Sequence, residues 1–215
     1  MNLKEVAKSL LPNLAIDVYR ERKRYQIEKR DIHRYLLNPL PPPPALLKRR
    51  IVREYGKRHN VRVLIETGTW CGDMVAYCRD SFRAIYSIEL DPELAAHAQR
   101  RFRDDRHIRV LHGDSGKLLP GILSEINEPA VFWLDGHFSG PGTGRGEKDT
   151  PLEEELDAIA LHHIKNHVIL VDDVRMFGTT DYPPLEMIER KFLALNPQCT
   201  FEVSDDILRF APPCK

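Results

Sequence analysis

Short apolar runs rich in β-branched residues alternate with helix-type segments along most of this chain. Five of these runs each end on an acidic residue, and they are Val61–Glu66, Ala84–Glu89, Ile108–Asp114, Ala130–Asp135 and Val168–Asp173. Short apolar runs separated by helical segments are typical of parallel strands in an α/β sheet. The pattern therefore predicts a sheet with one acidic group at the end of each of five strands.

Helix-type segments follow the predicted strands. They are Asp73–Arg79, Pro92–Phe102, Ser115–Leu123, Pro151–Ile164 and Pro184–Leu195. Proline suits the first turn of a helix, because the N–H that it lacks has no partner there. Near the C-terminus, Phe201–Val203 and Ile207–Phe210 flank a polar turn and predict a hairpin. We expect a doubly wound, Rossmann-like α/β sheet of about seven strands, mostly parallel with a C-terminal antiparallel hairpin.

The N-terminal part of the chain follows a different pattern. Residues 3–37 have a moderately amphipathic helical pattern with a break at Pro12. The segment Asn38–Pro44 (NPLPPPP) cannot form a helix, and its four consecutive prolines predict a stiff polyproline spacer. We therefore expect a helical extension and linker over residues 1–44 and a globular α/β domain over residues 45–215.

Charge is distributed unevenly, although the formal net charge of the chain is zero. Residues 1–60 carry 15 Lys and Arg against 6 Asp and Glu, whereas the remainder carries 17 against 26. Basic arms bind nucleic acid, anionic lipid or acidic partners. The simpler interpretation is a solvated helix that packs on the acidic domain or on a second subunit, so a homodimer formed through the arm is one hypothesis. Nucleic acid is not expected, because the arm has no recognised nucleic-acid motif.

Composition narrows the class of protein. The four cysteines are not arranged as CxxC pairs or Cys/His clusters, so we expect reduced thiols rather than a zinc site or a disulfide framework. The chain has no run of about 18 apolar residues that would span a membrane. Its N-terminus lacks the order of basic and apolar residues of a secretory signal, and we expect a cytoplasmic protein.

The acidic strand ends predict a ligand site. Ligands of open α/β sheets bind beyond the carboxyl ends of the strands. The first turn, Glu66 to Gly72 (ETGTWCG), has Trp70 in the region where a dinucleotide fold needs a second glycine beside the pyrophosphate. Because the bulky indole fills the region that a pyrophosphate would need, it favours a nucleoside ligand without a pyrophosphate. Glu89 could accept hydrogen bonds from both ribose hydroxyls, and Asp114 with Ser115 suits an adenine. For each acid alone, a helix N-cap or a solvated loop position is the alternative.

At this point the chain resembles a known family. In order, ETGTWCG, IYSIELD, HGDS and FWLDGHFSG resemble class I S-adenosylmethionine-dependent methyltransferases. More narrowly, ETGTWCG, LDGH and the VDD pair resemble the macrocin O-methyltransferase (TylF-like) group, which methylates sugar hydroxyls with a divalent metal. The resemblance covers roughly residues 45–210, and the basic arm lies outside it. It implies a methyltransferase domain that binds S-adenosylmethionine through Glu66, Thr67, Gly68, Thr69, Trp70, Gly72, Glu89, Asp114 and Ser115.

A second group of acids suggests a metal. Asp135, Asp172 and Asp173 end two neighbouring predicted strands, and three close carboxylates repel one another unless they are protonated or neutralised. Mg²⁺ prefers such oxygen ligands, and the resembled group binds Mg²⁺ through the corresponding acids. Alternatively, Asp172 caps the following loop and Asp173 pairs with Arg175. His137 could act with Asp135 in catalysis as a general base. It could instead bind substrate or serve as an ordinary polar loop residue.

The leading hypothesis is a Mg²⁺-assisted, S-adenosylmethionine-dependent O-methyltransferase that acts on a hydroxyl of a sugar, a glycoside or a similar small polar acceptor. N-methylation is less favoured, because LDGH replaces the Asn/Asp-Pro-Pro-aromatic turn that would hold an amine. A catalytically silent protein that binds the cofactor and recruits partners through the basic arm is the alternative. An NAD-dependent oxidoreductase is disfavoured by Trp70 and the missing second glycine.

Overall fold

The computed structural model describes residues 23–138, 140, 144, 148–179 and 181–213. These residues divide into two compact units after Lys48. In the first unit a helix covers residues 23–37, and residues 38–44 form neither helix nor strand. Helix α2 (Ala45–Arg58) begins directly after the prolines. The helix break expected at Pro12 lies outside the described residues.

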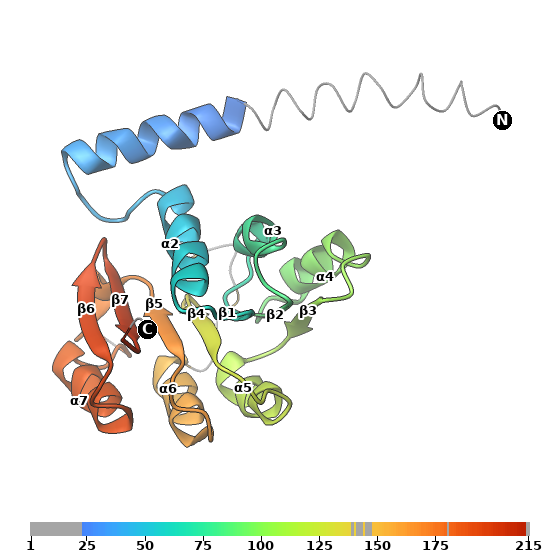
Figure 1. The fold of residues 1–215 in the computed structure, drawn as a ribbon. Helices are drawn as coiled ribbons and strands as arrows, with labels where there is room; N and C mark the ends of the chain where they lie inside the picture. Colours follow the sequence, from blue (N-terminus) through green and yellow to red (C-terminus); the bar gives the residue numbers. More distant parts are fainter. Residues whose placement is uncertain (1–22, 139, 141–143, 145–147, 180, 214–215) are drawn as a thin grey trace. The chain divides into compact units, whose positions relative to one another are not determined.

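The second unit is built on a seven-stranded sheet with the order β3-β2-β1-β4-β5-β7-β6 (Figure 1). Strands β1 to β5 run parallel, whereas β7 pairs antiparallel with both β5 and β6. This confirms the predicted sheet, including its C-terminal hairpin. The strands are β1 (Val63–Thr67), β2 (Ala84–Glu89), β3 (Ile108–His112), β4 (Ala130–Leu134), β5 (Val168–Val171), β6 (Thr200–Ser204) and β7 (Ile207–Ala211).

Helices cover both faces of this sheet (Figure 1). One face carries α3 (Asp73–Cys78), α4 (Pro92–Arg101) and the part of α2 that belongs to this unit. The opposite face carries α5 (Ser115–Ser124), α6 (Leu152–Leu161) and α7 (Leu185–Leu195), and a short 3₁₀ helix (Val174–Met176) follows β5. Because both faces are covered, β1, β4 and β5 are buried at every position, as their continuous apolar sequences require. The central strands therefore form a rigid base for the loops at their ends.

Among the residues that the structure describes, no helix combines the length and the apolar character that a membrane crossing requires.

A buried histidine pair lies at the amino ends of β4 and β5, opposite the acidic strand ends. The Ala130 N–H donates to His167 Nδ1 (3.0 Å), and His167 Nε2 lies 2.9 Å from His162 Nδ1. His162 Nε2 in turn lies 3.0 Å from the carbonyl oxygen of Ile126. One arrangement of protons satisfies this chain: His167 Nε2 donates to His162, and His162 Nε2 donates to Ile126. Both rings are then neutral, and burial lowers the pKa of His167 to about 3.

The contribution of His167 to the free energy of unfolding should decrease as the pH falls below about 6.5, whereas groups with a raised pKa, such as Glu66 and His137, act in the opposite direction. The unfolded chain binds a proton at His167 near its ordinary pKa of 6.5, whereas the folded chain leaves it neutral down to about pH 3. One such proton changes stability by about 1.4 kcal/mol per pH unit in this window. Urea unfolding at pH 7.5 and 5.5 measures the effect. Between pH 7.5 and 5.5 the free energy of unfolding of His167→Gln should shift upward relative to that of the wild type, whereas His97→Gln, at an exposed position of α4, should change as the wild type does. Equal pH dependence in all three proteins would contradict this assignment.

Candidate active site

A cavity of about 450 Å³ lies at the carboxyl ends of β1 to β4. This volume is in the range of small-molecule sites, about 300–1,000 Å³. The strand order reverses between β1 and β4, which are hydrogen-bonded neighbours, so the cavity lies at a topological switch point. The predicted site residues that line it are Gly68, Trp70, Glu89, Asp114, Ser115, Asp135 and His137.

The turn after β1 approaches the end of β4 closely because it contains Gly68. Its φ of 82° is in the left-handed region, and a Cβ atom there would lie 2.3 Å from the backbone oxygen of Asp135. Only glycine avoids both penalties. Trp70 also has a positive φ, and its side chain is 58% exposed at the cavity. The turn after β1 is therefore tight and brings its backbone against the end of β4.

Glu89 ends β2 and is buried at the cavity wall. Its Oε2 accepts a hydrogen bond from the Trp70 N–H (2.7 Å), and its Oε1 accepts one from the Asp91 N–H (3.0 Å). Two backbone donors therefore fix the carboxylate. Each carboxylate oxygen has a second lone pair, so both can still accept a hydrogen bond from a ligand hydroxyl.

Asp114 and Ser115 follow β3, the neighbour of β2, and form the start of α5. Asp114 is the N-cap, and its side chain accepts a hydrogen bond from the Gly116 N–H (3.0 Å). Lys117 Nζ lies 3.2 Å from the second carboxylate oxygen of Asp114. The helix-cap alternative therefore holds for this acid, and both Asp114 and Ser115 nevertheless face the cavity.

Four other predicted cofactor residues, Glu66, Thr67, Thr69 and Gly72, do not line the cavity. Glu66 is buried, and the Ser87 hydroxyl donates to its Oε2 (2.5 Å). The Thr69 hydroxyl lies 2.6 Å from the same Ser87 hydroxyl. Burial raises the pKa of Glu66 to about 8. The Glu66 and Thr69 side chains are therefore joined through Ser87 of β2.

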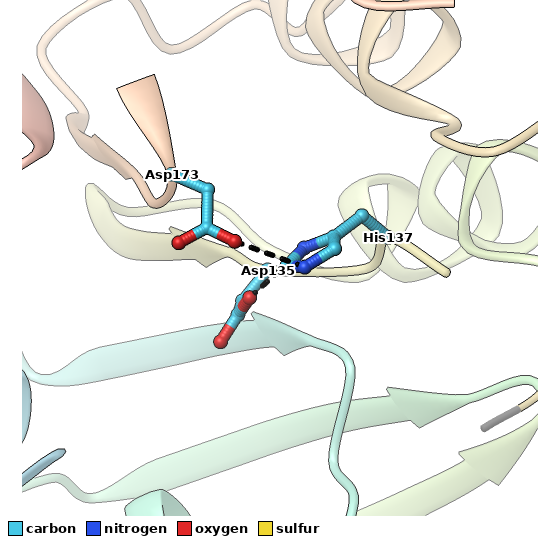
Figure 2. Close-up of side chains that lie close together, drawn as sticks. All are labelled: Asp135, His137 and Asp173. Atoms are coloured by element: carbon cyan, nitrogen blue, oxygen red, sulfur yellow. Dashed lines mark ion pairs between the residues drawn. The ribbon is translucent and has the colours of Figure 1, made fainter. Parts of the chain in front are cut away.

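A group of three side chains, Asp135, His137 and Asp173, converges at the ends of β4 and β5 (Figure 2). His137 Nδ1 lies 3.2 Å from Asp135 Oδ1, and His137 Nε2 lies 3.0 Å from Asp173 Oδ2. Each side chain offers one possible metal-ligand atom, and these three atoms all lie within 4.8 Å of one another. The imidazole ring therefore bridges the two carboxylates, as Figure 2 shows.

The two carboxylates favour a proton on His137. Burial lowers the pKa of this imidazole, but the hydrogen bonds and charges of Asp135 and Asp173 outweigh burial and raise the pKa to about 10. At neutral pH the ring is then a cation that compensates the two acids. The mutual repulsion that the sequence predicts is thus relieved by a proton in this arrangement.

Asp172 lies outside the group of three. Its side chain is buried, and its Oδ1 accepts a hydrogen bond from the Asp173 N–H (2.9 Å). Arg175 Nη1 donates to Asp173 Oδ1 (2.7 Å) and also to Asp206. One feature of the alternative interpretation is present, because Asp173 pairs with Arg175, whereas the N-cap of the 3₁₀ helix after β5 is Asp173 and not Asp172. Of the three acids predicted to bind a metal, the structure brings together Asp135 and Asp173.

Glu155 on α6 is a residue of this region that the sequence patterns did not single out. It is 1% exposed, and the Ser115 hydroxyl donates to its Oε1 (2.5 Å). The signal was present in the sequence, because Glu155 occupies the same helix face as the apolar residues Leu152, Leu156 and Ile159. A carboxylate at a core position of an amphipathic helix indicates a buried polar partner.

No protein-family model matches this chain, and no curated protein matches its sequence. Solved structures are similar to it in fold. The O-methyltransferase TomG from Streptomyces achromogenes, involved in tomaymycin synthesis and solved with SAM, has a TM-score of 0.55 and 15% identity over 86% of this chain and 89% of its own. A candidate caffeoyl-CoA O-methyltransferase from Staphylococcus aureus has a TM-score of 0.53 and 12% identity over 93% of this chain and 100% of its own.

The methyltransferase PaMTH1 from Podospora anserina, solved with SAH, has a TM-score of 0.52 and 13% identity over 78% of each chain. At these identities the likeness shows the fold that the proteins share. The chain thus has the Rossmann-like fold of these methyltransferases, as its sequence predicts.

Proposed function

We propose that this protein is an S-adenosylmethionine-dependent O-methyltransferase. Its acceptor is a hydroxyl of a sugar, a glycoside or a similar small polar molecule, and Mg²⁺ assists the reaction. The observation that carries the proposal is the Glu89 carboxylate, which two backbone N–H groups hold at the wall of the switch-point cavity. The similar structures of TomG and PaMTH1 were solved with SAM and SAH, and this also supports the proposal.

The cavity residues fit an adenosine. Glu89 can accept hydrogen bonds from the ribose hydroxyls, as a carboxylate at the end of the second strand does in nucleotide-binding α/β folds. Asp114 can accept from an exocyclic amine, and the apolar side chains of Ile88, Leu90 and Leu94 line the cavity where a base could pack. S-adenosylmethionine, when bound, supplies an activated methyl group on a sulfonium.

The donors at Asp135 and Asp173 fit a divalent cation. Their carboxylate oxygens are the hard ligands that Mg²⁺ prefers, and they belong to a group of ligand atoms within 4.8 Å of one another. A cation bound there would lower the pKa of His137 and so favour the neutral imidazole. It would also lower the pKa of an acceptor hydroxyl. Asp172, immediately before Asp173, would act by holding the Asp173 backbone.

The chain's own residues supply orientation and a proton acceptor. Asp135 and His137 line the cavity at the end of β4, so an acceptor hydroxyl placed there lies beside a carboxylate oxygen. His137 can accept the hydroxyl proton when it is neutral, and Asp135 can accept it when His137 is protonated. Arg175 donates to Asp173, and Asp173 contacts His137 Nε2, so Arg175 helps to hold the imidazole in place.

Two measurements test this function. Calorimetry with S-adenosylhomocysteine should show binding, and labelled S-adenosylmethionine should transfer methyl to a panel of glycosides in the presence of Mg²⁺. Treatment with EDTA should reduce transfer at least tenfold and leave S-adenosylhomocysteine affinity within about threefold, because Glu89 and Asp114 are not in the metal group. Added Mg²⁺ should restore transfer.

Other outcomes separate the remaining hypotheses. Binding of S-adenosylhomocysteine without transfer to any acceptor would favour a silent, partner-recruiting protein. Full transfer in EDTA would exclude the metal-assisted version and retain the methyltransferase. Stabilisation by NAD and not by S-adenosylhomocysteine in a thermal-shift comparison would exclude the proposal altogether.

A further inference from the structure

We propose that Glu155 is a positioning residue that holds the adenosine side of the cavity and the Asp135–His137 turn in a fixed relation to each other. This inference rests on the proposed function, because the cavity that Glu155 supports is the proposed cofactor site. Glu155 itself does not line that cavity. It acts through two hydroxyl groups, those of Thr67 at the end of β1 and of Ser115 at the start of α5.

The first connection leads to the adenosine side. The Ser115 hydroxyl donates to Glu155 Oε1 at 2.5 Å, and Ser115 lines the cavity at the start of α5. Ser115 and Glu155 are both buried, so water does not compete for this hydrogen bond. The bond joins α6 to the start of α5.

The second connection leads to the reacting side. The Thr67 hydroxyl lies beside the Glu155 carboxyl and lowers its pKa by hydrogen bonding, and the Asp135 N–H donates to both Thr67 Oγ1 (3.2 Å) and the Thr67 carbonyl oxygen (3.2 Å). A hydroxyl that donates to Glu155 and accepts from Asp135 is fixed in both roles. Glu155 is thereby linked through one side chain to the backbone of Asp135.

The packing around Gly136 shows how closely these groups meet. A Cβ atom at Gly136 would lie 3.1 Å from Thr67 Oγ1 and 3.3 Å from Glu155 Oε1. The backbone between Asp135 and His137 thus passes directly over the Thr67 and Glu155 oxygens. A change at Glu155 therefore reaches the two turns that hold Ser115 and Asp135.

An acid is the side chain that suits this position. Two buried hydroxyls hydrogen-bond to it, and replacing it with an apolar residue would leave both without this acceptor. Burial raises the pKa of Glu155 to about 7, the hydrogen bonds from Ser115 and Thr67 oppose this, and the charges of Asp114 and Glu154 add to it. Above pH 7 the carboxylate accepts from both hydroxyls, whereas the protonated form has an O–H donor in place of one acceptor and binds them less well.

Calorimetry with S-adenosylhomocysteine tests the proposal in four proteins: the wild type, Glu155→Leu, Glu155→Gln and Asp157→Asn. Leucine matches the apolar surroundings and removes both acceptors, so affinity should fall at least tenfold. Glutamine keeps an acceptor for Ser115 and loses the second acceptor oxygen, as the protonated acid does, so its affinity at pH 8 should lie between those of the wild type and Glu155→Leu. Asp157, on the same helix but exposed, should make no difference. A folded Glu155→Leu protein with wild-type affinity would overturn the proposal.

A pH series keeps the proposal testable even if Glu155→Leu does not fold. Between pH 8 and pH 6 the wild-type affinity should fall more than that of Glu155→Gln, which has no proton to gain at this position. Parallel pH profiles of the two proteins would refute the role of Glu155.

A measurement without ligand separates this inference from the proposed function. If the wild type does not bind S-adenosylhomocysteine, the proposed function fails. The coupling is then measured by hydrogen exchange of the Asp135 amide, which donates to the Thr67 hydroxyl, the partner of Glu155, and to the Thr67 carbonyl oxygen. Faster exchange in Glu155→Leu or Glu155→Gln than in the wild type and Asp157→Asn supports the positioning role, and equal rates overturn it.

Discussion

Asp135→Asn is expected to lower methyl transfer at least 100-fold and to leave affinity for S-adenosylhomocysteine within about threefold. The substitution keeps the size of the side chain and removes the charge that contacts His137 and would bind a cation. Loss of a positioned proton acceptor alone costs about 10²–10⁴-fold in rate. The contacts of Glu89 and Asp114 do not involve Asp135, so the cofactor side should be retained. Steady-state transfer and calorimetry measure the two effects.

The matched control is Asp104→Asn, whose side chain is 90% exposed and pairs only weakly with its neighbour Arg103. It should transfer methyl at the wild-type rate. Full turnover by Asp135→Asn would remove both the metal-assisted mechanism and the role of Asp135 as a proton acceptor. Equal loss of turnover and of S-adenosylhomocysteine affinity would instead show that Asp135 maintains the cavity as a whole.

Glu89→Gln should weaken binding of S-adenosylhomocysteine by about 100-fold. Both carboxylate oxygens accept backbone N–H groups, and an amide offers one oxygen, so its NH₂ group must face the N–H of Trp70 or of Asp91. Hydrogen bonds to a charged group contribute about 1.5–3 kcal/mol each, and 1.4 kcal/mol corresponds to a tenfold change in affinity. The substitution therefore disturbs both the turn and the ribose contacts.

Calorimetry of Glu89→Gln is compared with that of Glu93→Gln. Glu93 is an exposed acid in the first turn of α4, close to Glu89 in sequence but not among the residues that line the cavity. The Glu93→Gln protein should bind S-adenosylhomocysteine with wild-type affinity. An affinity of Glu89→Gln within threefold of the wild type would mean that the cofactor is not held at the end of β2.

The strands and helices of the α/β unit could be predicted from local sequence. Strand β2 has the predicted bounds, and α4 and α5 begin at the predicted Pro92 and Ser115. Helices α6 and α7 begin one residue after the prolines expected to start them. The prediction succeeded because apolar runs of strand length and helix-start signals are local properties of the chain.

The site was predicted less completely, and Asp172 shows the reason. Asp172 and Asp173 are adjacent carboxylates after the same strand, and nothing local distinguishes them. The positive φ of 57° at Asp173 turns the chain there, so its carboxylate meets His137 and Arg175, whereas Asp172 is buried beside it. Glu66 and Glu155 are also buried, and each is hydrogen-bonded to a serine that is distant in sequence. The Glu66 partner is 21 residues away and the Glu155 partner is 40 residues away.

The sequence by itself determined the α/β architecture and the edge of the sheet at which the acids gather, because strand direction and strand ends follow from the order of apolar and polar residues. Only the tertiary structure decided which acids face the cavity, which lie beneath it and that His137 joins Asp135 to Asp173. These outcomes depend on backbone turns and on contacts between distant loops, and neither is encoded in the residues next to each acid.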